Sequence, residues 1–90
     1  MIDIVTYVKL FTILAAISET CGVIVPVNSG IRTPEHNKRV GGVPDSKHLT
    51  GEALDLGLHG MSSTERSCVI TQSRLQYKKV LVYPNHLHVE

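Results

Sequence analysis

The 90-residue sequence has no tryptophan, one phenylalanine and only two cysteines. Two widely separated cysteines, Cys21 and Cys68, exclude a disulfide framework and a zinc site built from cysteine ligands. We expect both to be buried free thiols, because an unpaired cysteine packs as a small apolar side chain. A single bridge between them is the alternative.

The sequence also lacks an excess of charge of either sign. Nine Lys and Arg residues face eight Asp and Glu residues, which gives a net charge of +1. No basic stripe is available to neutralise phosphates, so we expect neither nucleic acid nor an anionic membrane as an obligate partner. A chain this short supports one hydrophobic core, and residues 1–90 are therefore predicted to form a single domain.

Long hydrophobic runs are missing too. The apolar run Leu10–Ile17 falls short of the roughly 20 residues that cross a bilayer. Asp3 precedes it and Lys9 is its only positive charge, whereas a signal peptide begins with a basic region. We therefore expect a buried helix here, no evident signal peptide, and a soluble protein that does not insert into a membrane.

The amino-terminal half predicts a helix, a strand and a helical turn. Apolar residues at helical spacing indicate a helix over residues 2–20, with Gly22 just past its end. The expected buried face consists of Ile4, Val8, Phe11 and Ala15, widened by Leu10, Leu14 and Ile17. The valine-rich segment Val23–Ser29 predicts a strand, which Pro26 confines to a sheet edge or to a shorter piece. Thr33-Pro34 is typical of a cap and first residue of a short helix.

The carboxyl-terminal half predicts a strand, a helix and a hairpin. Leucines alternate with other residues over Ala53–Leu58, the pattern of a strand with one buried face. A capping box formed by Ser62 and Glu65 begins a helix that ends near residue 74. Residues 79–83 and 86–90 are the strands of the hairpin. This irregular order predicts an α+β fold, in which helices pack on one face of a small antiparallel sheet.

Two separated segments carry metal-ligand chemistry. The segment Ser46–Asp55 and the segment His86–His88 supply two imidazoles and a carboxylate, from His48, His88 and Asp55. A catalytic zinc ion uses three such ligands and keeps a fourth position open for water. Strand alternation turns Asp55 away from the leucine face, and it puts His86, His88 and Glu90 on one face of the last strand. We therefore predict one zinc ion bound by His48, Asp55 and His88.

Hydrolysis by a metal-activated water also needs a base and a cation. Zinc lowers the pKa of its bound water to about 7, but a base must take the proton and a cation must stabilise the oxyanion. His86 is the predicted base, with an exposed strand histidine as the alternative. Arg32 is the predicted cation, with a structural ion pair to Asp or Glu as the alternative. Glu52 and Glu90 are expected to be solvated, and His36 and His59 to be ordinary surface residues.

The motifs around these residues resemble a known family. They are Ser29–Pro34, Asn37, Gly41–Pro44, Ser46–His48, Gly51–Asp55 and His86–Val89. They are similar to the zinc D-alanyl-D-alanine carboxypeptidases, a family that includes D-alanyl-D-alanine dipeptidases and phage L-alanyl-D-glutamate endopeptidases and shares its fold with the hedgehog signalling domain. The resemblance implies the zinc ligands named above, an Arg32 that contacts the scissile carbonyl, and a Ser46 that supports the substrate site. It also implies a bacterial cell-wall peptide containing D-amino acids as substrate.

One position departs from the pattern of the family. Asn85 stands three residues before the last histidine ligand, where many members carry the acidic general base. Relatives that end in His-x-His use the first histidine, which here is His86. The leading hypothesis is a zinc metallopeptidase of carboxypeptidase or endopeptidase type that cuts peptidoglycan stem or cross-link peptides. It would be made in the cytoplasm and act at the cell wall, in association with a phage or accessory protein. The alternative is a catalytically silent zinc-binding module for cell-wall recognition or virion structure.

Overall fold

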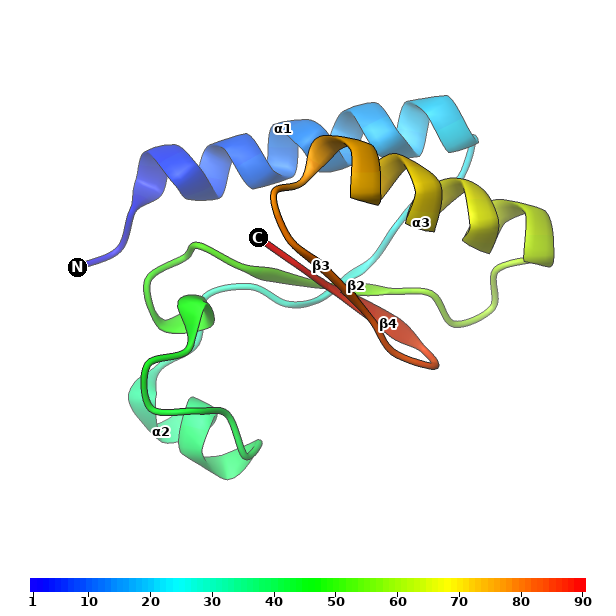
Figure 1. Cartoon of the computed structure of the whole chain (residues 1–90). Helices are drawn as coiled ribbons and strands as arrows, with labels where there is room; N and C mark the ends of the chain where they lie inside the picture. The colour runs from blue at the N-terminus through cyan, green and yellow to red at the C-terminus, as the bar shows by residue number, and fades with distance from the viewer.

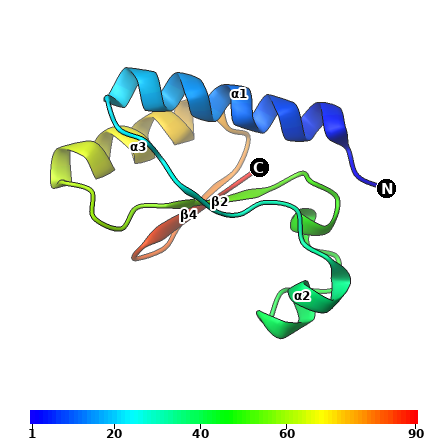
Figure 2. The ribbon, with the colours of Figure 1, turned by 180° about the vertical axis from the view of Figure 1, so that it is seen from behind.

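The computed structural model describes residues 1–90 as three α-helices, a short 3-10 helix and one antiparallel sheet of four strands (Figure 1). The elements are, in order, α1 (Ile4–Cys21), β1 (Val27–Ser29), α2 (Pro34–Arg39), η1 (Lys47–Leu49), β2 (Leu54–Gly57), α3 (Ser63–Gln76), β3 (Val80–Val82) and β4 (His86–Val89). Helices α1 and α3 lie together on one side of the sheet, and α2 lies on the other side (Figures 1 and 2). The predicted α+β class is confirmed.

Helix α1 begins and ends where local chemistry favours it. The Asp3 carboxylate accepts a hydrogen bond from the Thr6 backbone N–H at 3.0 Å, which satisfies one of the free donors of the first turn. At the other end Gly22 adopts a φ of 65°, a left-handed conformation that glycine takes without steric cost. The predicted stop at Gly22 is therefore confirmed.

The predicted buried face of α1 is wrong in part. Its buried residues are the widening set Leu10, Leu14 and Ile17, whereas all four residues of the main predicted face are exposed: Ile4, Val8, Phe11 and Ala15. The reason is geometric: at 3.6 residues per turn, the stripe of Ile4, Val8, Phe11 and Ala15 lies about 120° around the helix from that of Leu10, Leu14 and Ile17. Only the second stripe faces α3 and the sheet. Exposed apolar residues of α1 with the preceding chain are Met1, Ile2, Ile4, Val5, Val8 and Phe11.

Helix α1 is also long and apolar enough to resemble a membrane span. Its 18 residues, with a mean hydropathy of 1.5, satisfy the length and composition of a membrane span. Core helices of soluble proteins and amino-terminal signal sequences satisfy the same criterion, and 17% of this stretch is buried. The expectation that this helix is too short to cross a bilayer is wrong in length, because it counted only Leu10–Ile17 and the helix runs over Ile4–Cys21.

The sheet has the strand order β1-β2-β4-β3, and all neighbouring strands are antiparallel. Strand β1 begins directly after Pro26, which confirms that the proline shortens the predicted strand. In the two central strands, alternate residues are completely buried against α1 and α3: Leu54, Leu56, Leu87 and Val89. The intervening residues of β2 and β4 point to the opposite face, where the predicted site residues lie.

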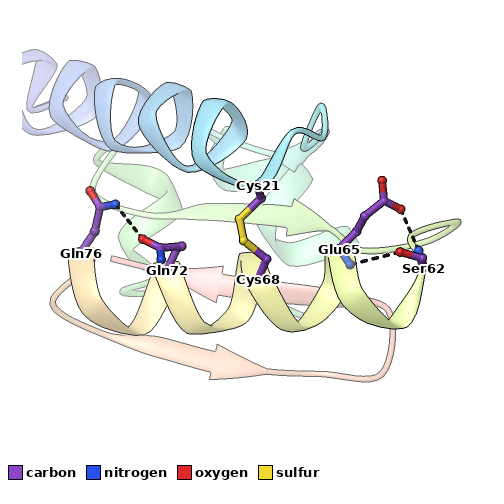
Figure 3. The surroundings of a disulfide bond; sticks show 6 residues. All are labelled: Cys21, Ser62, Glu65, Cys68, Gln72 and Gln76. Carbon is purple, nitrogen blue, oxygen red and sulfur yellow. Dashed lines mark hydrogen bonds between the residues drawn. A yellow bond between two sulfur atoms is a disulfide. The ribbon is translucent and has the colours of Figure 1, made fainter.

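The helix caps and the hairpin follow the sequence signals. Thr33 caps α2 with Pro34 at its first position, and the reciprocal capping box of Ser62 and Glu65 begins α3. Both parts of this box, at 2.9 and 3.1 Å, are drawn in Figure 3. Strands β3 and β4 form the predicted hairpin.

The prediction of two free thiols is wrong. Cys21 and Cys68 form a disulfide that joins the last residue of α1 to the middle of α3 (Figure 3). The packing of α1 on α3 brings the two Cα atoms to 5.7 Å, within the range that a bridge spans without backbone movement. This proximity is a product of tertiary packing, which spacing along the chain does not reveal.

Candidate metal centre

Strand pairing places a carboxylate beside an imidazole. Asp55 of β2 is the direct partner of His88 of β4, so both side chains leave the same face of the sheet. His88 Nδ1 lies 3.1 Å from Asp55 Oδ1. His48 reaches the same oxygen from η1, with its Nε2 at 3.2 Å. Two donors bound to one tetrahedral zinc ion lie about 3.4 Å apart, so these separations suit a shared cation.

The orientation of His48 is fixed by its outer nitrogen. Ser46 caps η1 by accepting from the His48 backbone N–H at 3.3 Å, and the ring Nδ1–H donates to the Gly30 carbonyl at 2.8 Å. This bond leaves Nε2 unprotonated and directed at Asp55. That nitrogen is completely buried and has no hydrogen-bond partner of its own. An unsatisfied buried acceptor is costly unless something binds it, so the site fits a cation.

The three residues form one group with a suitable donor set. A ligand atom from each of His48, Asp55 and His88 lies within 4.8 Å of the other two. The two imidazole rings meet edge to face, with centroids 5.1 Å apart. Two nitrogens and one carboxylate oxygen are the ligands that catalytic zinc takes. The structure thus brings together the three residues that the sequence singled out.

The charges within the group favour an ionised carboxylate. Burial would raise the pKa of Asp55, but the two imidazoles of His48 and His88 that face its carboxylate outweigh this and hold the pKa well below its usual range. The neighbouring Asp55 carboxylate raises the pKa of His88, burial opposes this, and the contact with Glu90 adds to the rise. Asp55 is therefore available as an anionic ligand at neutral pH.

Arg32 is anchored within the site. Its Nη2 donates to Asp55 Oδ2 at 3.0 Å, Nη1 to Asn37 Oδ1 at 3.2 Å, and Nε to Ser29 Oγ at 3.1 Å. A guanidinium group has five N–H donors, so two remain for a further acceptor. Gly42 lies so close to Asn37 and Arg32 that a Cβ atom there would collide with the Asn37 side chain. The structural ion pair and a role toward substrate are thus compatible in this residue.

A cavity of about 240 Å³ opens onto the metal group. His86 and Ser46 line it, as do Arg32 and the segment Val40–Val43. His86 stacks on Tyr83, with ring centroids 4.5 Å apart and planes 6° from parallel. Tyr83 also lines the cavity, and it is a site residue that the sequence analysis missed. The signal that could have identified Tyr83 is its position at the end of the first hairpin strand, across the turn from His86.

Glu90 was expected to be solvated, and this is wrong. Its Oε2 lies 2.8 Å from His88 Nε2, and the side chain is 22% exposed. The remaining expectations hold for His36 and His59, which are exposed. Glu52 bonds to Thr50 at 2.6 Å, outside the metal group. Asn85 is exposed and does not line the cavity.

A family model supplies the remaining observation. The model described as Peptidase M15 matches residues 2–90, nearly the entire chain. The chain belongs to the peptidase M15 family. The predicted family is therefore confirmed. Peptidases M15 are zinc-dependent metallopeptidases that act on peptides of the bacterial cell wall, and the group of His48, Asp55 and His88 could hold such a metal ion. No curated protein and no solved structure shows significant similarity to this M15 chain.

Proposed function

We propose that the protein is a zinc metallopeptidase that hydrolyses stem or cross-link peptides of peptidoglycan. The observation that carries the proposal is the convergence of His48, Asp55 and His88 on one buried point at the wall of an open cavity. Membership of the peptidase M15 family supports the same reaction class.

The proposed roles follow from the position of each group. His48, Asp55 and His88 would hold one zinc ion, which when bound supplies Lewis-acid chemistry by acidifying water and polarising a carbonyl. Arg32 directs its two spare N–H donors at the carbonyl oxygen, where negative charge develops during attack. Ser46, which lines the same cavity, contributes to binding the peptide.

His86 is the proposed proton acceptor. It lines the cavity on the same face of β4 as His88, and its stack on Tyr83 restricts the rotation of the ring. Histidine is the side chain that enzymes use most often as a general acid or base. His86 takes a proton from the attacking water and returns it to the leaving amine.

The place of action is part of the proposal. A disulfide persists in oxidising compartments and is rare in the cytosol, so the Cys21–Cys68 bridge supports work outside the cytoplasm. Such work at the bacterial cell wall suits a lytic or virion-associated enzyme with a phage or accessory partner. Both a carboxypeptidase and an endopeptidase are compatible with the open cavity.

A second function is a zinc-binding module without activity, which recognises cell-wall peptide or has a structural part in a particle. Asn85 favours it, because an amide cannot accept the proton that the acid of many relatives takes. The two functions differ only in turnover, since both need the metal group and the cavity.

One experiment separates the two functions. We expect the purified protein to bind one zinc ion and to release peptides from peptidoglycan fragments, followed by mass spectrometry. The variant His86→Ala should retain zinc and lose about 100-fold or more in rate, the typical contribution of a positioned base. His59→Ala is the matched control, because His59 is exposed outside the cavity. One bound zinc without any cleavage would favour the silent module, and a fully active His86→Ala would show that another group takes the proton.

A further inference from the structure

Each of the two histidines of the metal group has an oxygen acceptor at its outer nitrogen, but the two acceptors differ in charge. His48 directs Nε2 into the group and uses Nδ1 to bond the Gly30 carbonyl. His88 directs Nδ1 into the group, and its Nε2 lies 2.8 Å from Glu90 Oε2. Each ring therefore has one nitrogen facing Asp55 and an oxygen acceptor on the other. One of these acceptors, a carbonyl, is neutral, and the other is a carboxylate.

We propose that Glu90 is a positioning residue for His88, an inference that rests on the proposed metal-dependent function. An ionised carboxylate only accepts hydrogen bonds, so Glu90 requires a proton on His88 Nε2. With the proton there, Nδ1 presents its lone pair toward Asp55 and His48. A carboxylate on the outer nitrogen also makes the imidazole a stronger donor to a metal.

Glu90 itself is held in place from the neighbouring strand. Its backbone N–H donates to the Lys79 carbonyl at 2.9 Å, and its carbonyl accepts from the Lys78 and Lys79 N–H groups at 3.0 and 3.3 Å. The Lys79 ammonium lies 3.8 Å from Oε2, but its side chain is 56% exposed, so this screened ion pair adds little to the backbone anchoring. Glu90 contacts the ring nitrogen that points away from Asp55, and it is outside the group of potential ligands. Its role is therefore to orient His88, not to bind the cation.

The test measures zinc affinity and the protonation of the His88 ring. Zinc dissociation constants come from competition with a chelator, for the wild type, Glu90→Gln and Glu90→Ala. Nitrogen-15 spectra of the imidazole ring report which nitrogen of His88 carries the proton in the zinc-loaded protein. Two control variants accompany them. Lys79→Ala removes the ion pair but leaves the Glu90 contact with His88, and Glu19→Ala removes an exposed carboxylate of α1, on the helix side of the sheet (Figure 1).

We expect Glu90→Ala to weaken zinc binding by about 10- to 100-fold, the usual effect of an outer-shell partner. Glu90→Gln, which keeps an acceptor oxygen, should lose less, and both controls should stay within about twofold of the wild type. The spectra should show the proton on His88 Nε2. Wild-type affinity in Glu90→Ala, an equal loss in Lys79→Ala, or a proton on Nδ1 overturns the inference. If the wild type binds zinc and one of these results is found, only the role of Glu90 is overturned and the proposed function is intact. If the wild type binds no zinc, the role of Glu90 and the proposed function are both overturned.

Discussion

The two faces of the central strands differ in almost every physical property. On the helix side, Leu54, Leu56 and Leu87 are completely buried against α1 and α3. On the other side, Asp55 and His88 are 13% and 17% exposed at the edge of the cavity. Both faces come from the same two strands, because successive side chains of a strand point in opposite directions.

The comparison shows that one register fixes both the core and the site. The pairing of Asp55 with His88 is the neighbour of the pairing of Leu56 with Leu87. A slip by one residue would place the leucines in the cavity and the ligands in the core. Burial of the apolar face therefore pre-organises the metal group before any cation binds. Stability and chemistry share the same strands, but they are carried by different side chains.

The strongest test of this division pairs one substitution from each face. Leu56→Ala should lower the free energy of unfolding by about 3–5 kcal/mol, because Leu56 is fully buried and its removal leaves a cavity. His88→Ala should change the stability of the metal-free protein much less but weaken zinc binding by more than the roughly 100-fold of an outer partner. Urea unfolding without metal and chelator competition measure the two effects.

The division is contradicted if the two variants behave alike. Zinc affinity of Leu56→Ala has to be measured where the protein is fully folded, since unfolding also removes the site. An equal loss of affinity in both variants would mean that the core does not act independently of the ligands. An equal loss of stability would mean that the metal group itself contributes to the core.

The second prediction concerns the helix layer alone. The Cys21–Cys68 bridge closes a loop of sequence separation 47, and removal of such a bridge costs about 2–4 kcal/mol, chiefly by freeing the unfolded chain. The double variant Cys21→Ser with Cys68→Ser should therefore unfold at lower urea concentration while retaining zinc affinity. Reduction of the wild type should reproduce the loss of stability and leave the variant unchanged. Loss of zinc affinity in the folded variant would show that a change in the helix layer alters the metal group on the opposite face of the sheet.

Features set by local chemistry were predictable from the sequence. The caps at Gly22, Thr33 and Ser62 need only a few neighbouring residues, and all three were predicted correctly. Period-two alternation likewise assigned the leucines to the core and Asp55 and His88 to the other face. The placement of His48 beside Asp55 and His88 was predicted from the motif around His48. The position of His48 in the sequence does not by itself show that η1 lies beside β2.

Features set by packing between distant elements were not predictable. The disulfide depends on the contact of α1 with α3, and two cysteines far apart in sequence do not report it. The exposure of Phe11 depends on which apolar stripe of α1 faces the core, and helical spacing alone suited more than one stripe. Glu90 was placed on the correct strand face, but its contact with His88 depends on side-chain rotation that alternation does not specify.

The smallest predicted effect concerns the polar group inside the apolar layer. Tyr77 is buried, and its hydroxyl donates to the Leu10 carbonyl at 2.9 Å, while burial raises the pKa of the phenol above its ordinary value. Because the folded pKa lies above the unfolded value of about 10, this contribution to stability is complete below pH 10 and is lost as the pH rises further.

Tyr77→Phe should cost about 1 kcal/mol at pH 8 through the lost hydrogen bond. Above pH 10 the wild type should lose stability faster than the variant, so that the difference between them shrinks in urea unfolding at pH 8 and 11. Parallel stability curves would mean that Tyr77 is not confined to its neutral form by the helix layer.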